Sequence, residues 1–169
     1  MINIMKETTV SEIMQKMIQA SQGNLHDINH FLKVYAYART IAQAENLSPA
    51  EQKTVEIAAI LHDIACPLCR EKYGNTNGKY QEAEGMPLAE AFLQSCRLPE
   101  EMISRIVYLV GHHHTLRDID GMDYQILLEA DYLVNADEAG YSVSNIRHTM
   151  ESLFKTSAGT ALLQSVYQL

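Results

Sequence analysis

The chain has few cysteines, little positive charge and no long hydrophobic run. Its three cysteines are an odd number and too few for a disulfide framework in a chain of 169 residues. The formal net charge of -8 provides no basic surface for a nucleic-acid backbone, so duplex DNA or RNA is disfavoured as a partner, whereas free nucleotides stay possible. No apolar run reaches the roughly 18 residues that a membrane span needs, and the first residues lack a secretory signal. We therefore expect a cytoplasmic protein without a membrane partner.

Strand patterning is also absent, whereas helix-start patterns recur. Thr9 and Glu12 have the spacing of a capping box, which predicts a helix running to about residue 20. Ser48-Pro49-Ala50-Glu51 combines a cap, a first-turn proline and a capping-box glutamate, and predicts a helix to about residue 63. We expect further helices over residues 27–46, 80–95, 99–113, 124–139, 144–154 and 157–167. Residues 66–79, which contain Pro, Gly and Asn, are expected to be irregular.

The length and composition suit one domain. With 169 residues, 47% of them hydrophobic, the chain is long enough for one well-buried core and short for two. We therefore predict a single all-α domain over residues 1–169.

Ligand-type side chains interrupt three apolar helix faces. His62-Asp63 closes the apolar run over residues 55–61, His30 lies on the face of Val34 and Ile41, and Asp131 lies on an apolar face of the helix predicted over residues 124–139. A single such residue is more often a buried histidine bonded to a carbonyl, or an aspartate paired with an arginine. Two imidazoles and two carboxylates together are better explained as a metal ligand set.

The order His30, His62-Asp63, Asp131 on successive helices resembles the HD superfamily of metal-dependent phosphohydrolases, which is named for its His-Asp dipeptide. The matching segments read His-x-x-Lys-Val from His30, Ala-Ala-Ile-Leu-His-Asp up to Asp63, and Glu-Ala-Asp up to Asp131. The resemblance implies an HD-type helical bundle in which His30, His62, Asp63 and Asp131 hold one divalent ion. Mixed nitrogen and oxygen ligation suits Mn, Fe, Co, Ni or Zn, and the sequence does not choose among them.

A second dipeptide, His26-Asp27, follows a segment of loop composition. We interpret Asp27 as the cap of the helix that carries His30. His26 is then a loop residue or an outer member of the site.

Three consecutive histidines follow the helix predicted over residues 99–113. Continuing its apolar face turns His113 and His114 inward and His112 toward solvent. The resemblance gives His113 and His114 a role in binding a second metal or a substrate phosphate; a polar helix end interacting with the helix dipole is the other interpretation. Gln81 stands where many two-metal family members carry a histidine, so a single-metal site is expected, with a second metal near His113 and His114 as the alternative.

Four cations are candidates for substrate binding. Arg70, Lys72 and Lys79 follow the His62-Asp63 pair, and Lys33 lies one turn after His30. Charge-assisted hydrogen bonds from such side chains grip phosphate oxygens, although for any single one a solvated surface charge is the simpler interpretation.

Two other polar residues lie near Asp131. Asn135 shares its helix face and is expected to orient a ligand or a water, whereas Glu129 is expected to face solvent or to pair with a surface cation.

The sequence therefore predicts a phosphohydrolase for a small phosphomonoester or nucleotide phosphate, acting through a metal-activated water. Asp63 would hold the metal and help to take the water's proton, and His113, His114 and the cations would stabilise charge on the phosphoryl group. Two alternatives stay open: a diiron oxygenase of the HD type, and a non-catalytic module that binds a nucleotide around a structural metal.

Overall fold

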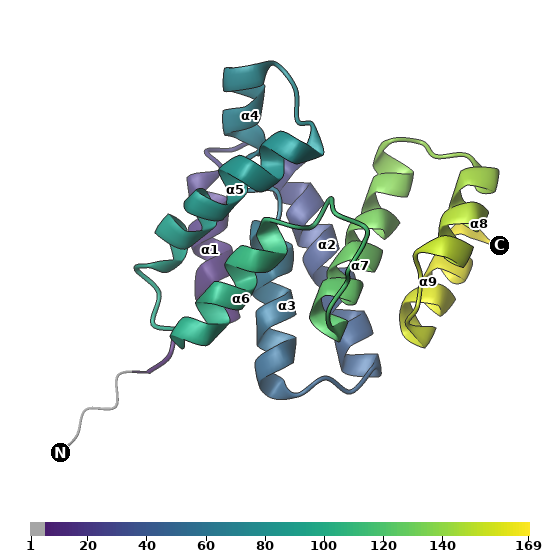
Figure 1. The fold of residues 1–169 in the computed structure, drawn as a ribbon, viewed down its shortest axis with the longest axis horizontal. Coiled ribbons are helices and arrows are strands. Elements are labelled where there is room, and N and C mark those ends of the chain that lie inside the picture. Colours follow the sequence, from purple (N-terminus) through teal and green to yellow (C-terminus); the bar gives the residue numbers. More distant parts are fainter. Residues whose placement is uncertain (1–5) are drawn as a thin grey trace.

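The computed structural model describes residues 6–169, which form nine α-helices and no strand (Figure 1). The predicted all-α class is therefore confirmed. Eight of the helices overlap the predicted ranges, and one was not expected. The bounds are α1 Val10–Ala20, α2 Leu25–Ala44, α3 Pro49–Leu61, α4 Cys66–Tyr73, α5 Gly78–Leu93, α6 Glu100–Val110, α7 Met122–Glu138, α8 Val143–Ser152 and α9 Ser157–Tyr167.

The first three helices begin at side-chain caps. The Thr9 hydroxyl accepts the Glu12 backbone N–H at 3.2 Å, and the Glu12 carboxylate accepts the Thr9 backbone N–H at 2.7 Å, which completes the predicted capping box of α1. Ser48 and Glu51 form the same pair at the start of α3. The cap of α2 differs from the prediction, because Asn24 rather than Asp27 is the capping residue.

Helix α4 occupies most of the segment that was expected to be irregular. Pro67 lies in its first turn, where the missing N–H has no intrahelical partner to lose. Gly74 ends the helix with φ of 70°, the left-handed conformation in which glycine is free of Cβ strain. The two residues that suggested a loop therefore mark the ends of a helix, and the irregular connection shrinks to residues 74–77.

Helix α3 lies at the centre of the bundle. All of its residues from Thr54 to Leu61 are buried, because α1, α2, α6 and α7 pack around it. Helix α7 is similarly buried from Tyr124 to Asp131. The His62-Asp63 pair directly follows α3, so it lies at the end of a helix that packs against both α2 and α7.

Helices α8 and α9 lie beside α7, on the side of the molecule away from α5 and α6 (Figure 1). Glu129 of α7 fixes this pair and, contrary to the prediction, is fully buried at 0% exposure. Its carboxylate accepts the backbone N–H groups of Lys155 at 2.7 Å and Thr156 at 3.0 Å, and the Gln125 amide at 2.8 Å. A buried carboxylate is tolerated because these donors replace water.

Among residues 6–169, no helix combines the length and the hydropathy that crossing a membrane requires.

Candidate metal centre

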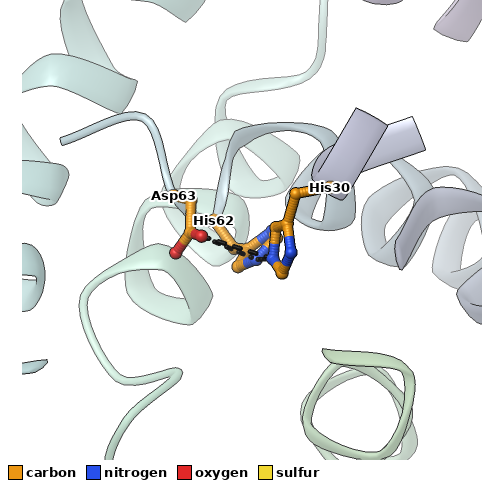
Figure 2. A group of neighbouring side chains, drawn as sticks. All are labelled: His30, His62 and Asp63. Atoms are coloured by element: carbon orange, nitrogen blue, oxygen red, sulfur yellow. Dashed lines mark hydrogen bonds and ion pairs between the residues drawn. The ribbon is translucent and has the colours of Figure 1, made fainter. Parts of the chain in front are cut away.

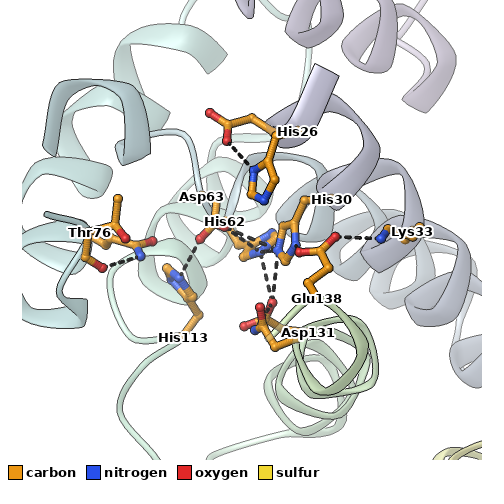
Figure 3. A network of polar contacts seen from close by, with 12 residues as sticks. His26, His30, Lys33, His62, Asp63, Thr76, His113, Asp131 and Glu138 are labelled. Carbon is orange, nitrogen blue, oxygen red and sulfur yellow. Dashed lines mark hydrogen bonds and ion pairs between the residues drawn. The ribbon is translucent and has the colours of Figure 1, made fainter. Parts of the chain in front are cut away.

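Four side chains from α2, α7 and the turn after α3 meet at one place (Figure 3), and Figure 2 shows three of them, His30, His62 and Asp63. His30 Nε2 lies 3.1 Å from His62 Nε2, 3.2 Å from Asp131 Oδ1 and 3.3 Å from Asp63 Oδ2. His62 Nε2 lies 3.4 Å from Asp131 Oδ1 and 3.6 Å from Asp63 Oδ2. The structure thus brings together the four residues that the sequence predicted as metal ligands.

Hydrogen bonds on the far side of each imidazole fix which nitrogen faces the cluster. His62 Nδ1 donates to the Ala59 carbonyl at 2.7 Å, and a carbonyl can only accept, so Nδ1 carries a proton. His30 Nδ1 likewise donates to a Glu138 carboxylate oxygen at 2.7 Å. Each Nε2 is therefore available to the cluster, as in metal-binding histidines whose other nitrogen is hydrogen-bonded.

Three of the four side chains are buried, Asp63 is partly exposed, and the charges of the cluster depend on each other. His62 has 0% exposure and Asp131 has 8%. Burial opposes charge on His62, but the Asp63 and Asp131 carboxylates raise its pKa to about 9. Burial also opposes charge on Asp131, yet His62 and His30 hold the pKa of this carboxyl well below its ordinary value. The two carboxylates thus require a positive charge between them, and this donor set fits a divalent ion as well as a proton.

Asp63 also contacts a second group of possible ligands through its other oxygen. Asp63 Oδ1 lies 3.3 Å from His113 Nε2, and the ligand atoms of Asp63, His113 and His114 all lie within 4.8 Å of one another. His113 is buried, as predicted, and its Nδ1 donates to the Val110 carbonyl at 2.8 Å. His114 is exposed, contrary to the expectation that it points inward, with its ring centroid 4.0 Å from that of His113.

Gln81 of α5 lies on the side of its helix that faces this second group. Gly78, one turn earlier, packs against the His114 ring, and Gly85, one turn later, packs against Val110 of α6. The Gln81 amide nitrogen donates to the Thr76 carbonyl at 2.8 Å, while its Oε1 is buried and has no hydrogen-bond partner.

Two buried side-chain polar atoms lack a hydrogen-bond partner among residues 6–169, and these are Gln81 Oε1 and His113 Nε2. His113 Nε2 has no proton when the ring is neutral, so both atoms are acceptors. A cation or a hydrogen-bond donor beside Asp63 Oδ1 would satisfy such acceptors. The sequence indicated Gln81 only as the replacement of a histidine and did not predict this unsatisfied oxygen.

Comparison with known proteins agrees with this geometry. The family model described as the HD domain matches residues 27–141. The chain belongs to the HD domain family. It is similar to a solved structure described as a predicted HD superfamily hydrolase from an uncultured Thermotogales bacterium, with a TM-score of 0.67 and 22% identity over 94% of this chain and 84% of that chain. At this identity the similarity supports the fold, and no curated protein matches the chain.

The predicted membership of the HD family is thus confirmed, and the two His-Asp dipeptides can be told apart. His62-Asp63 lies in the cluster, whereas the His26 side chain is 76% exposed. His26 is in the first turn of α2 rather than in a loop, with Nδ1 3.2 Å from Asp27 Oδ1. The dipeptide at the centre of this HD domain is therefore His62-Asp63.

Two further residues of α7 form hydrogen bonds with members of the cluster. The Asn135 amide donates to Asp131 Oδ1 at 2.9 Å, in line with the predicted orienting role. Glu138, which bonds His30, was not predicted. It follows Asp131 by seven residues, so two helical turns place it on the same face, and this spacing could have indicated it.

The four candidate substrate-binding cations differ in their surroundings. Lys33 Nζ lies 2.6 Å from Glu138 Oε1, Arg70 pairs with Asp27, and Lys72 pairs with Glu84. Lys79 lies over the Tyr80 ring, 4.7 Å from its centroid. Lys33 is therefore linked to the cluster through Glu138, while phosphate binding by any of the four stays a prediction.

Proposed function

We propose that this HD domain is a divalent-metal-dependent phosphohydrolase that acts on a small phosphomonoester or nucleotide phosphate. The observation that carries the proposal is the convergence of His30, His62, Asp63 and Asp131. The distances from each histidine Nε2 to the other Nε2 and to the aspartate oxygens are 3.1 to 3.6 Å. Each imidazole turns its Nε2 toward the carboxylates, because its Nδ1 is hydrogen-bonded elsewhere. Such a set of ligands would hold one Mn, Fe, Co, Ni or Zn ion.

A divalent ion in this position would make a bound water more acidic and would neutralise charge on phosphate oxygens. The side chains around it supply the proton acceptors. Asp63 Oδ1 faces His113 Nε2 at 3.3 Å, away from His30 and His62. Both atoms can accept a proton from a water that lies between them and the substrate. Asp63 is therefore proposed as both ligand and proton acceptor, with His113 beside it.

The phosphate would meet cations on two helices. Arg70 and Lys72 lie on α4 and Lys79 lies on α5. Because Arg70 and Lys72 already pair with carboxylates, a substrate phosphate would compete with Asp27 and Glu84 for them. His114, exposed next to His113, is proposed to contact the same phosphate.

The test begins with elemental analysis of protein purified without chelator, followed by a phosphate-release screen with the metal found. The Asp63→Ala variant is expected to lose the bound ion and at least about 100-fold in activity, because it removes a ligand and a proton acceptor together. Circular dichroism verifies that the variant keeps its helices.

The second His-Asp dipeptide offers a matched control. Asp27→Ala removes a carboxylate from the same kind of pair, outside the cluster, and is expected to keep the bound ion. Full activity in Asp63→Ala would refute the proposed mechanism.

A second candidate, a diiron oxygenase, is favoured by the group of Asp63, His113 and His114 and by the two unsatisfied acceptors. An iron content of about two per chain and oxygen-dependent turnover would support it over the hydrolase. Tight nucleotide binding without turnover, for every metal added, would instead support a binding module.

A further inference from the structure

Glu138, the last residue of α7, joins two residues of α2. Its Oε2 accepts the His30 Nδ1–H at 2.7 Å, and its Oε1 lies 2.6 Å from Lys33 Nζ (Figure 3). The Glu138 side chain is only 19% exposed, against 44% for Lys33. The carboxylate is thus largely withdrawn from water and has both oxygens engaged.

The other two buried histidines of the site are held differently. His62 and His113 donate to main-chain carbonyls three residues earlier in the chain, at Ala59 and Val110. Their ring orientation follows from the local turn at a helix end. His30 lies inside α2, where the carbonyls are used by the helix itself, so its ring must be held by another element.

We propose that Glu138 is a positioning residue for His30, and that Lys33 holds Glu138 in place rather than binding substrate. The inference rests on the proposed metal site, because it concerns the affinity of that site for its ion. A carboxylate that accepts from the imidazole nitrogen not facing the metal fixes the tautomer and the orientation of the ring. It also makes the other nitrogen a stronger metal ligand. Lys33 neutralises part of that charge and restrains the carboxylate, since its Nζ contacts the oxygen that His30 does not use.

The chain contains a pair that serves as a comparison. Glu84 accepts from Lys72 and from the Tyr73 hydroxyl, so it is also a carboxylate with two donors, but it contacts no residue of the cluster. If Glu138 acted only as part of a surface ion pair, mutation of either glutamate would have the same effect on the affinity for the ion.

The experiment is a titration of the ion-free protein with Co²⁺, in which visible absorption and calorimetry monitor binding. Glu138→Gln and Glu138→Ala are expected to bind Co²⁺ about 10- to 100-fold more weakly than the wild type, as is usual for loss of such a partner, and to change the Co²⁺ absorption band. Lys33→Met is expected to weaken binding by less than Glu138→Gln. Glu84→Gln is expected to bind Co²⁺ as the wild type does.

Wild-type Co²⁺ affinity in Glu138→Gln would overturn the inference, as would an equal loss in Glu84→Gln or failure of the wild type to bind Co²⁺. If Glu138→Ala does not fold by circular dichroism, the near-isosteric Glu138→Gln variant decides. A raised KM for phosphate release in Lys33→Met at saturating metal, with unchanged Co²⁺ affinity, would return Lys33 to substrate binding. Absence of phosphate release by a wild type that binds Co²⁺ would refute the proposed function and leave this inference standing.

Discussion

Asp63 is the residue on which both groups of ligands depend. One of its oxygens faces His30 and His62, and the other faces His113. Burial raises its pKa, but the charge of His62 opposes this effect, and the pKa of Asp63 is lowered overall. An ionised carboxylate with two separate oxygens can hold one cation and still contact a second one or a water.

We expect the occupancy of the second group to depend on Gln81, because its unpartnered Oε1 is only a weak ligand atom. Gln81→His is expected to raise the Co²⁺ stoichiometry from about one to about two ions per chain, because an imidazole nitrogen is a much better donor for such ions than an amide oxygen. Equilibrium dialysis with metal analysis measures the ratio.

Gln81→Leu, which removes the amide without adding a ligand, is the control and should stay at about one ion per chain. Two tightly held ions in the wild type would contradict the expectation of a single-metal site.

Sequence patterns act over short distances along the chain. They therefore predicted the site residues whose position depends on local periodicity. His30, Asp131 and Asn135 were found because helical periodicity fixes their faces. The contact between Lys33 and Glu138 was not predicted, because Glu138 lies far along the chain. Glu129 was misplaced for the same reason, since its main-chain donors lie in the connection before α9.

At the scale of elements, helix ends were predicted where capping side chains mark them. Thr9 and Ser48 correctly predicted the starts of α1 and α3. Helix α4 was not predicted, because its boundary residues, Pro67 and Gly74, are typical of loops. Helix α9 matched its predicted range, but its attachment to α7 through Glu129 is a tertiary feature that no local pattern carries.

This attachment leaves no room for a side chain at Gly159. A Cβ there would lie 2.0 Å from Glu129 Oε2. An alanine inside a helix normally stabilises relative to glycine, but Gly159→Ala is expected to destabilise by about 1–3 kcal/mol because the buried carboxylate must move. Thermal unfolding followed by circular dichroism measures the difference.

Ser165→Ala, an exposed site on the same helix, is the control and should change the melting temperature little. A melting temperature for Gly159→Ala equal to or above that of the wild type would show that Glu129 does not hold α9 as described.

At the scale of the whole molecule, the cluster gathers opposite charges from α2, α7 and the turn after α3. When no metal is bound, a proton on His62 supplies the positive charge that Asp63 and Asp131 require. The stability of the fold is therefore expected to depend on pH at the same atoms that are proposed to bind the metal.

The pH dependence has a defined sign. The folded protein raises the pKa of His62 from 6.5 to about 9, so proton binding stabilises the fold fully below pH 6.5 and loses this effect as the pH rises through about 9. In the presence of chelator, the melting temperature is expected to fall across this interval. Saturating Mn²⁺, which replaces the proton, should reduce the fall.

Differential scanning fluorimetry across pH 6.5 to 9 measures both conditions, and His62→Gln serves as the control that lacks the titrating group. A chelated wild type whose melting temperature is flat or rises over this interval would contradict the linkage.

The wide spacing of the ligands along the chain has a practical consequence. Because His30, His62-Asp63 and Asp131 come from segments far apart in sequence, a molecule could bind the proposed ion only after these helices have assembled. If the proposed ion binds, metal content therefore gives a lower limit on the number of correctly assembled copies in a preparation. If the proposed metal-dependent activity is found, it is best normalised to bound ion rather than to total protein, since ion-free chains would lower the apparent rate without reporting on the chemistry.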